Sequence, residues 1–172
     1  MAMTQAADFI AVATKEIGTI EVPDNKTKYG VFTGHDGQPW CGSFVMWCAA
    51  QIGFKAMPNC VYTPAGAEVF KGQGQWFNPA TSKPQPGDIA FFSFDGKGIE
   101  HVGIVVKDNA DGTMTTIEGN TSPDAKPTGS QANGGEVALK TRAYKSSNTR
   151  HMPVFVVGFG SPKWANQSTY RR

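Results

Sequence analysis

The sequence predicts an α+β fold in which N-terminal helices pack on an antiparallel β-sheet. In the first third of the chain, apolar residues recur at spacings of three and four, which indicates amphipathic helices. From residue 88 onward, short runs rich in β-branched and aromatic residues are separated by turn residues, which indicates strands. Helices followed by a meander of strands are typical of an α+β domain. The 172 residues fit one domain with a core large enough to fold without disulfides.

Three helices are expected before residue 80. The first spans residues 6–18, where one face carries Ala6, Phe9, Ile10, Ala13 and Ile17. Residues 19–38 show little periodicity and are predicted to form a long ordered loop. The second helix, Trp40–Ile52, is apolar nearly all the way round, which indicates a buried central position. A short helix follows Thr63-Pro64, with Thr63 as its cap and Pro64 in its first turn.

The second half of the chain is predicted to form the sheet and the end of the domain. The expected strands are residues 88–94, 99–107, 113–118, 136–144 and 153–159. Residues 119–135 are rich in Gly, Ser, Pro and Asn and are expected to form a loop. We assign residues 1–160 to the folded domain and residues 161–172 to a C-terminal tail or linker.

Charge and hydropathy exclude several classes of protein. The net charge of +2 is too small to indicate a nucleic-acid partner. No run of residues approaches the roughly 18 apolar residues that a membrane helix needs, so we expect no stable membrane insertion. The first residues lack the basic and apolar regions of a secretory signal. We expect the protein to act as a monomer.

The three cysteines are an odd number, so disulfides cannot include all of them. Cys41 and Cys48 are separated by about 10 Å of helical rise, which is too far to bridge. A pair between Cys48 and Cys60 is possible, but in a reducing compartment buried free thiols are the simpler interpretation.

Cys41 is the candidate nucleophile. It lies in the first turn of the second predicted helix, where the helix dipole and the free backbone N–H groups favour a thiolate. The same N–H groups can hold an oxyanion, and Gly42 is expected to keep the backbone open to substrate. The alternative is a cysteine buried in the core. Gln38, three residues earlier, could donate its side-chain amide to the oxyanion, although an exposed loop glutamine is the slightly favoured interpretation.

His101 is the candidate base, because a nucleophilic thiol needs a partner that takes its proton. The other two histidines lie in predicted loops: His35 and His151. Strand alternation predicts one face with His101, Gly103 and Val105 and an opposite face with Val102, Ile104 and Val106. Gly103 leaves a gap beside the imidazole, as expected where another group approaches.

Glu118 and Asn120 end the next predicted strand, which should pair with the strand of His101. Either side chain could accept the Nδ1 proton of His101, and both would share a face if the strand continues through Gly119. We expect Glu118 to be the direct partner, because a carboxylate stabilises an imidazolium, and Asn120 to support the ring or the substrate. The simpler alternative is that Glu-Gly-Asn forms only a turn.

Four motifs together resemble the CHAP family of cysteine, histidine-dependent amidohydrolases/peptidases. They are Pro-Trp-Cys-Gly-Ser-Phe-Val-Met-Trp-Cys, Pro-Gly-Asp-Ile-Ala-Phe-Phe, His-Val-Gly-Ile-Val and Glu-Gly-Asn, in that order. The resemblance implies a papain-like CHAP fold over about residues 4–160, with Cys41, His101, Glu118 and Asn120 as the catalytic set. It also implies cleavage of a peptidoglycan amide, by an endopeptidase or an N-acetylmuramoyl-L-alanine amidase. Many members are phage endolysins, and the stretches around Asn25 and Gly34 are similar to CHAP domains of phages from Gram-positive hosts.

The sequence departs from the family in its loop before Cys41. Some CHAP enzymes carry alternating calcium-binding aspartates there, whereas this chain offers only Asp24, Asn25 and Asp36. We therefore expect no metal and no other cofactor. An enzyme without its own signal would remain in the host cytoplasm and act on the wall after release, or would be carried in the virion. The alternatives are therefore a tail-tip protein that degrades the wall and a non-catalytic wall-binding module.

Overall fold

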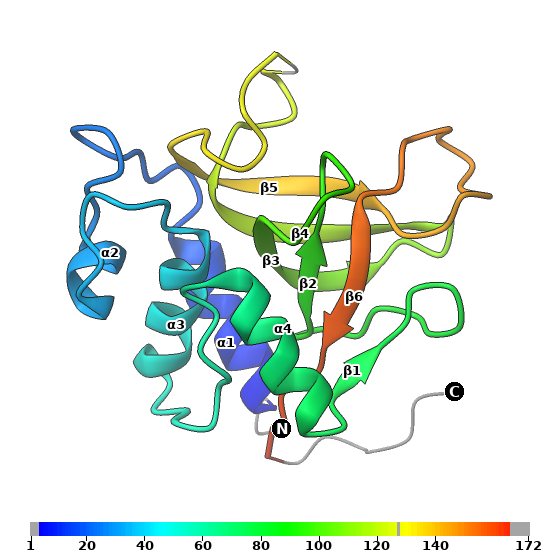
Figure 1. Ribbon diagram of the computed structural model, residues 1–172, viewed down its shortest axis with the longest axis horizontal. Helices are drawn as coiled ribbons and strands as arrows, with labels where there is room; N and C mark the ends of the chain where they lie inside the picture. Colours follow the sequence, from blue (N-terminus) through cyan, green and yellow to red (C-terminus); the bar gives the residue numbers. More distant parts are fainter. Residues whose placement is uncertain (1–3, 127, 166–172) are drawn as a thin grey trace.

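The computed structural model describes residues 4–126 and 128–165, and it confirms the α+β fold (Figure 1). The helices are α1 (Gln5–Lys15), α2 (Lys28–Thr33), α3 (Cys41–Gln51) and α4 (Thr63–Gly72). The strands are β1 (Trp76–Phe77), β2 (Ile89–Phe92), β3 (His101–Asp108), β4 (Thr113–Thr121), β5 (Glu136–Ala143) and β6 (Val156–Gly160). Among the described residues, no helix is both long and apolar enough to cross a membrane.

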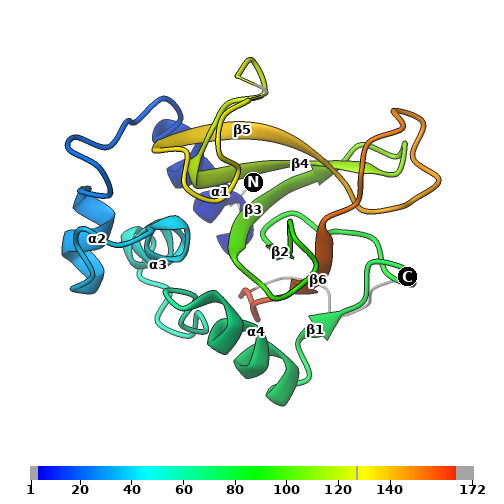
Figure 2. The same ribbon diagram turned by 45° about the horizontal axis from the view of Figure 1, so that its top comes forward.

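The strands form one antiparallel sheet in the order β1-β6-β2-β3-β4-β5. Strands β2 to β5 are the expected meander, and β6 returns along the other edge of β2 (Figure 2). Strand β1 was not predicted, because two residues are too few to show any alternation.

The sheet has two apolar faces. Helices α1 and α3 cover the face that carries Val102, Ile104 and Ile117. The opposite face holds a second cluster, which includes Phe92, Val105, Met114, Tyr144 and Phe159. The alternation predicted for β3 is therefore confirmed, with Val102 and Ile104 on the helix side and Val105 on the other.

Within the predicted loop of residues 19–38 the structure contains a helix, α2, so the prediction was wrong there. Thr27 caps α2 by accepting from the backbone N–H of Gly30, and Gly34 ends it with a left-handed φ of 75°. Six residues are less than two turns, so α2 leaves little periodic signal in the sequence.

Two predicted helix ends also differ. Thr63 is the first residue of α4 and not its cap, and its hydroxyl donates to the carbonyl of Ile99. Helix α1 ends at Lys15, so Ile17 lies beyond it and is 41% exposed.

The start of the predicted tail is packed on the domain. The Trp164 ring contacts the rings of Phe9 and Phe54, at centroid distances of 5.0 and 4.4 Å. The backbone N–H of Ala165 donates to the side chain of Gln5. Residues 161–165 therefore belong to the folded unit, and residues 166–172 lie outside the described residues.

Two glycines allow α3 to sit close to its neighbours. A Cβ at Gly42 would lie 1.8 Å from the carbonyl oxygen of Cys60, and a Cβ at Gly119 would lie 2.7 Å from the side-chain Cβ of Phe44. The expectation that Gly42 opens the backbone to substrate was therefore wrong. It faces the chain at Cys60 and lets that segment approach the start of α3.

We predict that Gly42→Ala destabilises the fold by about 3 kcal/mol, because the added methyl group meets a backbone atom that cannot move aside cheaply. Gly72→Ala is the matched control. Gly72 also lies in a helix, but nothing lies within 4 Å of its added Cβ, so the control should be neutral or slightly stabilising. Urea unfolding of both variants measures the difference, and equal midpoints would refute the steric argument.

Candidate active site

Cys41 is the first residue of α3 and is only 4% exposed. No side chain caps this helix end, so its first N–H groups remain available to a negative charge. Trp40, just before Cys41, is buried, stacks on Tyr29 and donates its indole N–H to Glu21 at 2.6 Å. The residue just before the thiol is therefore fixed by two side-chain contacts.

The pKa of the Cys41 thiol lies below its ordinary value. Burial raises this pKa, but the hydrogen bond with His101 and the charge of that ring lower it by more, and backbone N–H groups of Val102 and Gly42 add to the effect. Burial raises the pKa of both Cys48 and Cys60. All three cysteines are free thiols.

His101 is fully buried at the start of β3 and joins the thiol to a carboxylate. Its Nε2 lies 2.9 Å from Oε2 of Glu118. Its Nδ1 makes no regular hydrogen bond in the described structure, and it is the nitrogen left to interact with Cys41. Glu118 therefore contacts Nε2, and the prediction that it contacts Nδ1 was wrong.

Glu118 can approach the imidazole because Gly103, beside His101 on β3, has no side chain. A Cβ there would lie 2.6 Å from Cγ of Glu118, so the glutamate side chain lies over Gly103 and reaches Nε2 of His101. The predicted gap beside the imidazole is thus present, and Glu118 fills it. Burial lowers the pKa of His101, but its interactions with Cys41 and Glu118 raise it by more, to about 9. At neutral pH the ring is therefore an imidazolium, and it lies beside a thiol whose pKa is lowered.

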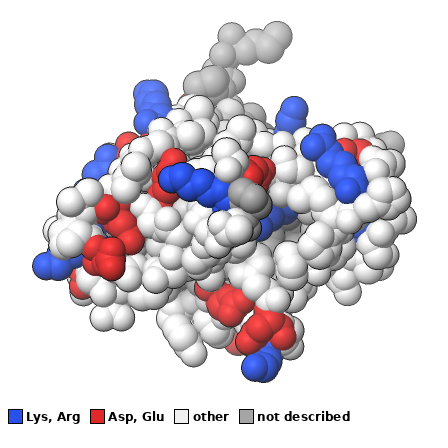
Figure 3. Space-filling model, turned by 90° about the horizontal axis from the view of Figure 1, so that it is seen from above, with Lys and Arg blue, Asp and Glu red and all other residues white. Residues whose placement is uncertain are grey.

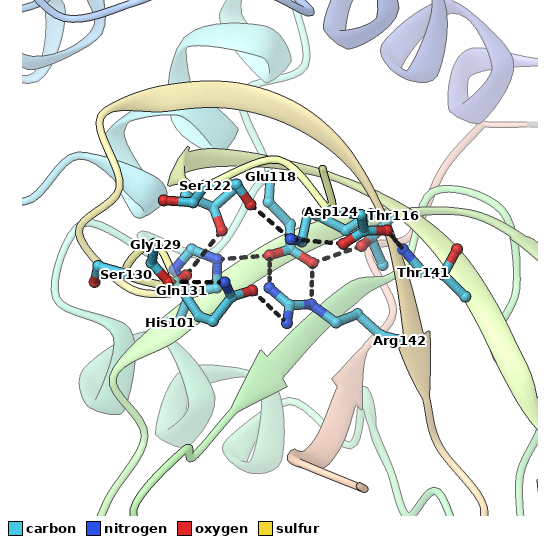
Figure 4. Close-up of polar contacts among 12 residues, drawn as sticks. His101, Thr116, Glu118, Ser122, Asp124, Gly129, Ser130, Gln131, Thr141 and Arg142 are labelled. Carbon is cyan, nitrogen blue, oxygen red and sulfur yellow. Dashed lines mark hydrogen bonds and ion pairs between the residues drawn. The ribbon is translucent and has the colours of Figure 1, made fainter. Parts of the chain in front are cut away.

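The carboxylate of Glu118 is fully buried and accepts four hydrogen bonds (Figure 4). Oε2 contacts His101 and also accepts from Arg142 Nη2 at 2.6 Å. Oε1 accepts from Arg142 Nε at 2.8 Å and from the Thr116 hydroxyl at 2.6 Å. Burial raises the pKa of Glu118, but the charge of Arg142 and these hydrogen bonds hold it well below the ordinary value. Glu118 is therefore ionised.

Arg142 was not predicted from the sequence. It lies on β5, and its guanidinium packs over the rings of Phe92 and Phe94, each 5.3 Å away. Its Nη1 donates to Oε1 of Gln131 at 3.0 Å. A cationic residue on a strand is usually solvated, so the sequence alone carries no signal that separates this arginine from a surface one.

Asn120 does not join this group. The register between β4 and β5 shifts between Glu118 and Thr121, and Asn120 takes a left-handed φ of 57°. Its amide therefore points to the neighbouring loops, where it bonds Asn133 at 2.9 Å, Asn25 at 3.3 Å and the N–H of Gly135 at 3.1 Å. The expectation that Glu118 and Asn120 share a face was wrong, because the strand does not continue regularly through Gly119.

The remaining candidates take no visible part in the site. Gln38 is exposed, and its backbone N–H donates to the carbonyl of His35. Its oxyanion role stays a prediction. Within residues 4–126 and 128–165, no group of three or more His, Cys, Asp and Glu side chains could hold a metal ion. On the face seen in Figure 3, acidic and basic side chains are interspersed with wide uncharged areas.

The fold and the site define an α+β protein in which a thiol at a helix start meets an imidazole and a carboxylate on a sheet. The chain belongs to the CHAP domain family, whose model matches residues 33–120. This range includes Cys41, His101, Glu118 and Asn120.

Solved structures share the fold. A crystal structure of Ly7917 is 14% identical with a TM-score of 0.50, and a crystal structure of Ly7917 with the hydrolyzing product of MDP is 13% identical with a TM-score of 0.52. Each match covers 91% of this chain but 62% of the other. No curated protein sequence matches the chain significantly.

We predict that iodoacetamide modifies Cys41 at neutral pH at least about tenfold faster than Cys48 or Cys60. Only the thiolate reacts, and only Cys41 has a lowered pKa. Peptide mapping by mass spectrometry measures the three rates, with Cys41→Ser as the control. Equal rates at the three positions would show that Cys41 is not activated.

Proposed function

We propose that this protein is a peptidoglycan hydrolase in which Cys41 attacks an amide carbonyl and His101 transfers the proton. The observation that carries the proposal is the buried chain of contacts from the Cys41 thiol through His101 to Glu118. A structural or binding domain has no need of a thiolate next to an imidazolium. The family and the fold shared with Ly7917, whose structure contains the hydrolyzing product of the peptidoglycan fragment MDP, support the same substrate class.

The geometry suggests the order of events. The Cys41 thiolate forms a bond to the carbonyl carbon, and the free N–H groups of the first turn of α3 stabilise the oxyanion. His101 then gives its Nδ1 proton to the amide nitrogen, the C–N bond breaks and an amine leaves. The neutral ring takes a proton from water as the water oxygen bonds to the thioester carbon. The C–S bond then breaks, which restores the Cys41 thiolate and leaves His101 protonated, and the released acid loses its proton to give a carboxylate. Glu118 stays ionised and stabilises the imidazolium throughout.

Two peptidoglycan amide bonds fit this chemistry. An N-acetylmuramoyl-L-alanine amidase frees the amine of the first stem residue, whereas an endopeptidase frees an amine within the stem or the cross-link. Mass spectrometry of fragments released from purified wall identifies the new amine and so distinguishes the two. Release of no fragment by the folded protein would favour the alternative of a non-catalytic wall-binding module.

We further propose that the protein is a phage endolysin, which acts on the wall after release from the host cytoplasm. The similarity of the stretches around Asn25 and Gly34 to CHAP domains of phages supports this origin. The alternative is a virion-associated protein that opens the wall at the tail tip. Detection of this chain in purified virions would favour the alternative.

We predict that Cys41→Ser abolishes lysis of purified wall and leaves the fold intact, because serine fits the site but is a far weaker nucleophile. Cys48→Ser and Cys60→Ser are the matched controls and should keep activity, although their burial can cost stability. Turbidity loss of a wall suspension measures the rates. Normal lysis by a folded Cys41→Ser protein would refute the mechanism.

We predict that Glu118→Gln slows lysis by about tenfold or more and that Asn120→Ala slows it less. Glu118 contacts the imidazole directly, whereas Asn120 contacts only loops. Both variants are compared on one wall preparation, with folding checked by circular dichroism. The reverse order of effects would mean that the site works as a Cys-His-Asn arrangement.

We predict that the lysis rate at limiting substrate falls as the pH rises through about 9. His101 must be protonated to release the amine, and its pKa is raised from an ordinary value of 6.5 to about 9. Activity therefore persists at pH 8, where an unperturbed histidine would already have lost its proton. A descending limb near pH 6.5 would contradict this assignment.

A further inference from the structure

The site contains four buried ionisable groups, and in its proposed reactive form two of them carry each sign. The negative groups are the thiolate of Cys41 and the carboxylate of Glu118. The positive groups are the imidazolium of His101 and the guanidinium of Arg142. Their exposed fractions are 4% for Cys41, 0% for His101 and Glu118, and 7% for Arg142. Burying a charge without a partner is costly, so a closed group of this kind must be close to neutral.

We propose that Arg142 is a positioning residue for the reaction, which fixes the Glu118 carboxylate against His101 and balances the negative charge of the site. This inference rests on the proposed roles of Cys41 and His101. It assigns a function to a residue on β5, outside the four motifs that carry the family resemblance.

The geometry of the pair supports the positioning role. The guanidinium contacts both oxygens of Glu118, at 2.8 and 2.6 Å, so the carboxylate cannot rotate away from the imidazole. The arginine is itself fixed by Gln131 on one side and by the rings of Phe92 and Phe94 on the other. The same two rings lie 5.8 Å from the His101 ring, so they shield both cations from water.

Among the described residues around the site, no other cation is placed to take over the role of Arg142. Lys140, the next residue on the same face of β5, is paired with Asp124 at 2.7 Å and donates to the carbonyl of Ser122. The groups that face the four charges are the Cys60 thiol from the chain before α4, Gly103 from β3, Thr116 from β4, Lys140 from β5, Phe92 and Phe94 from the β2 side, and Asp124 and Gln131 from the loop before β5. Lys140 and Asp124 balance one another, and the remaining groups in this set are neutral.

Loss of Arg142 would leave one uncompensated negative charge in the site. The protein can relieve it by binding a proton at Glu118 or at Cys41. A proton on Glu118 removes the partner that stabilises the imidazolium, and a proton on Cys41 removes the thiolate itself. Either event lowers the thiolate population, so the thiolate should form at higher pH.

The test is the pH dependence of Cys41 alkylation by iodoacetamide, which needs no peptidoglycan. We expect Arg142→Gln to move the midpoint upward by about one pH unit or more, a tenfold change in proton affinity. Arg150→Gln is the matched control, because Arg150 forms an exposed ion pair with Asp111 and should leave the midpoint unchanged. A folded Arg142→Gln protein with the wild-type midpoint would overturn the proposal.

Two further variants separate charge from structure. Arg142→Lys keeps the positive charge and should keep the midpoint pH of alkylation. Lysis can still be slower, because lysine cannot donate to both carboxylate oxygens as the guanidinium does. The double variant Glu118→Gln/Arg142→Gln removes one charge of each sign, so it should reverse most of the shift without restoring lysis. If Arg142→Gln does not fold, a shifted midpoint in folded Arg142→Lys overturns the proposal. Complete absence of alkylation at Cys41 in the wild type would instead refute the proposed nucleophile.

Discussion

A buried carboxylate constrains the rest of this structure. Glu118 has no contact with solvent, so its charge must be met by donors placed on neighbouring strands. Two of these donors are His101 on β3 and Arg142 on β5, and a third, Thr116, lies on β4, the strand of Glu118 itself. Their convergence depends on sheet register, because a slip of one residue would turn each side chain to the other face. The β-meander is therefore what assembles the site.

The proposed nucleophile, Cys41, lies beside His101 because α3 packs close to the sheet and to the chain at Cys60. Gly42 and Gly119 remove the side chains that would prevent this approach, and Gly103 removes the one that would separate Glu118 from His101. Each of the three glycines thus allows a close approach between two segments that form the site. The result is a thiol that meets a positive helix end and an imidazolium together, which lowers its pKa despite burial.

Much of this arrangement could be predicted from local patterns. Helix α3 and the meander follow from periodicity, and the structure brings Cys41, His101 and Glu118 together as expected. What failed depended on three-dimensional detail: α2 is too short to show a period, and the shift in register that turns Asn120 away leaves no mark in the sequence. Apolar residues are usually buried and charged residues exposed, but on β5 the apolar Leu139 is 51% exposed and the charged Arg142 is buried. Only the position of Glu118 explains that reversal.

The position of Arg142 in the chain separates two parts of the site. The family model matches residues 33–120, which contain the thiol, the imidazole and the carboxylate. Arg142 and Gln131 lie beyond this range, as does Asn133, which holds Asn120. The reacting groups thus come from the matched range, while the residues that complete the hydrogen bonding of Glu118 and Asn120 come from the segment after it. On the role proposed for Arg142, loss of this cation would be relieved by a proton at Glu118 or Cys41, so the proposed chemistry of the matched range depends on a strand outside it.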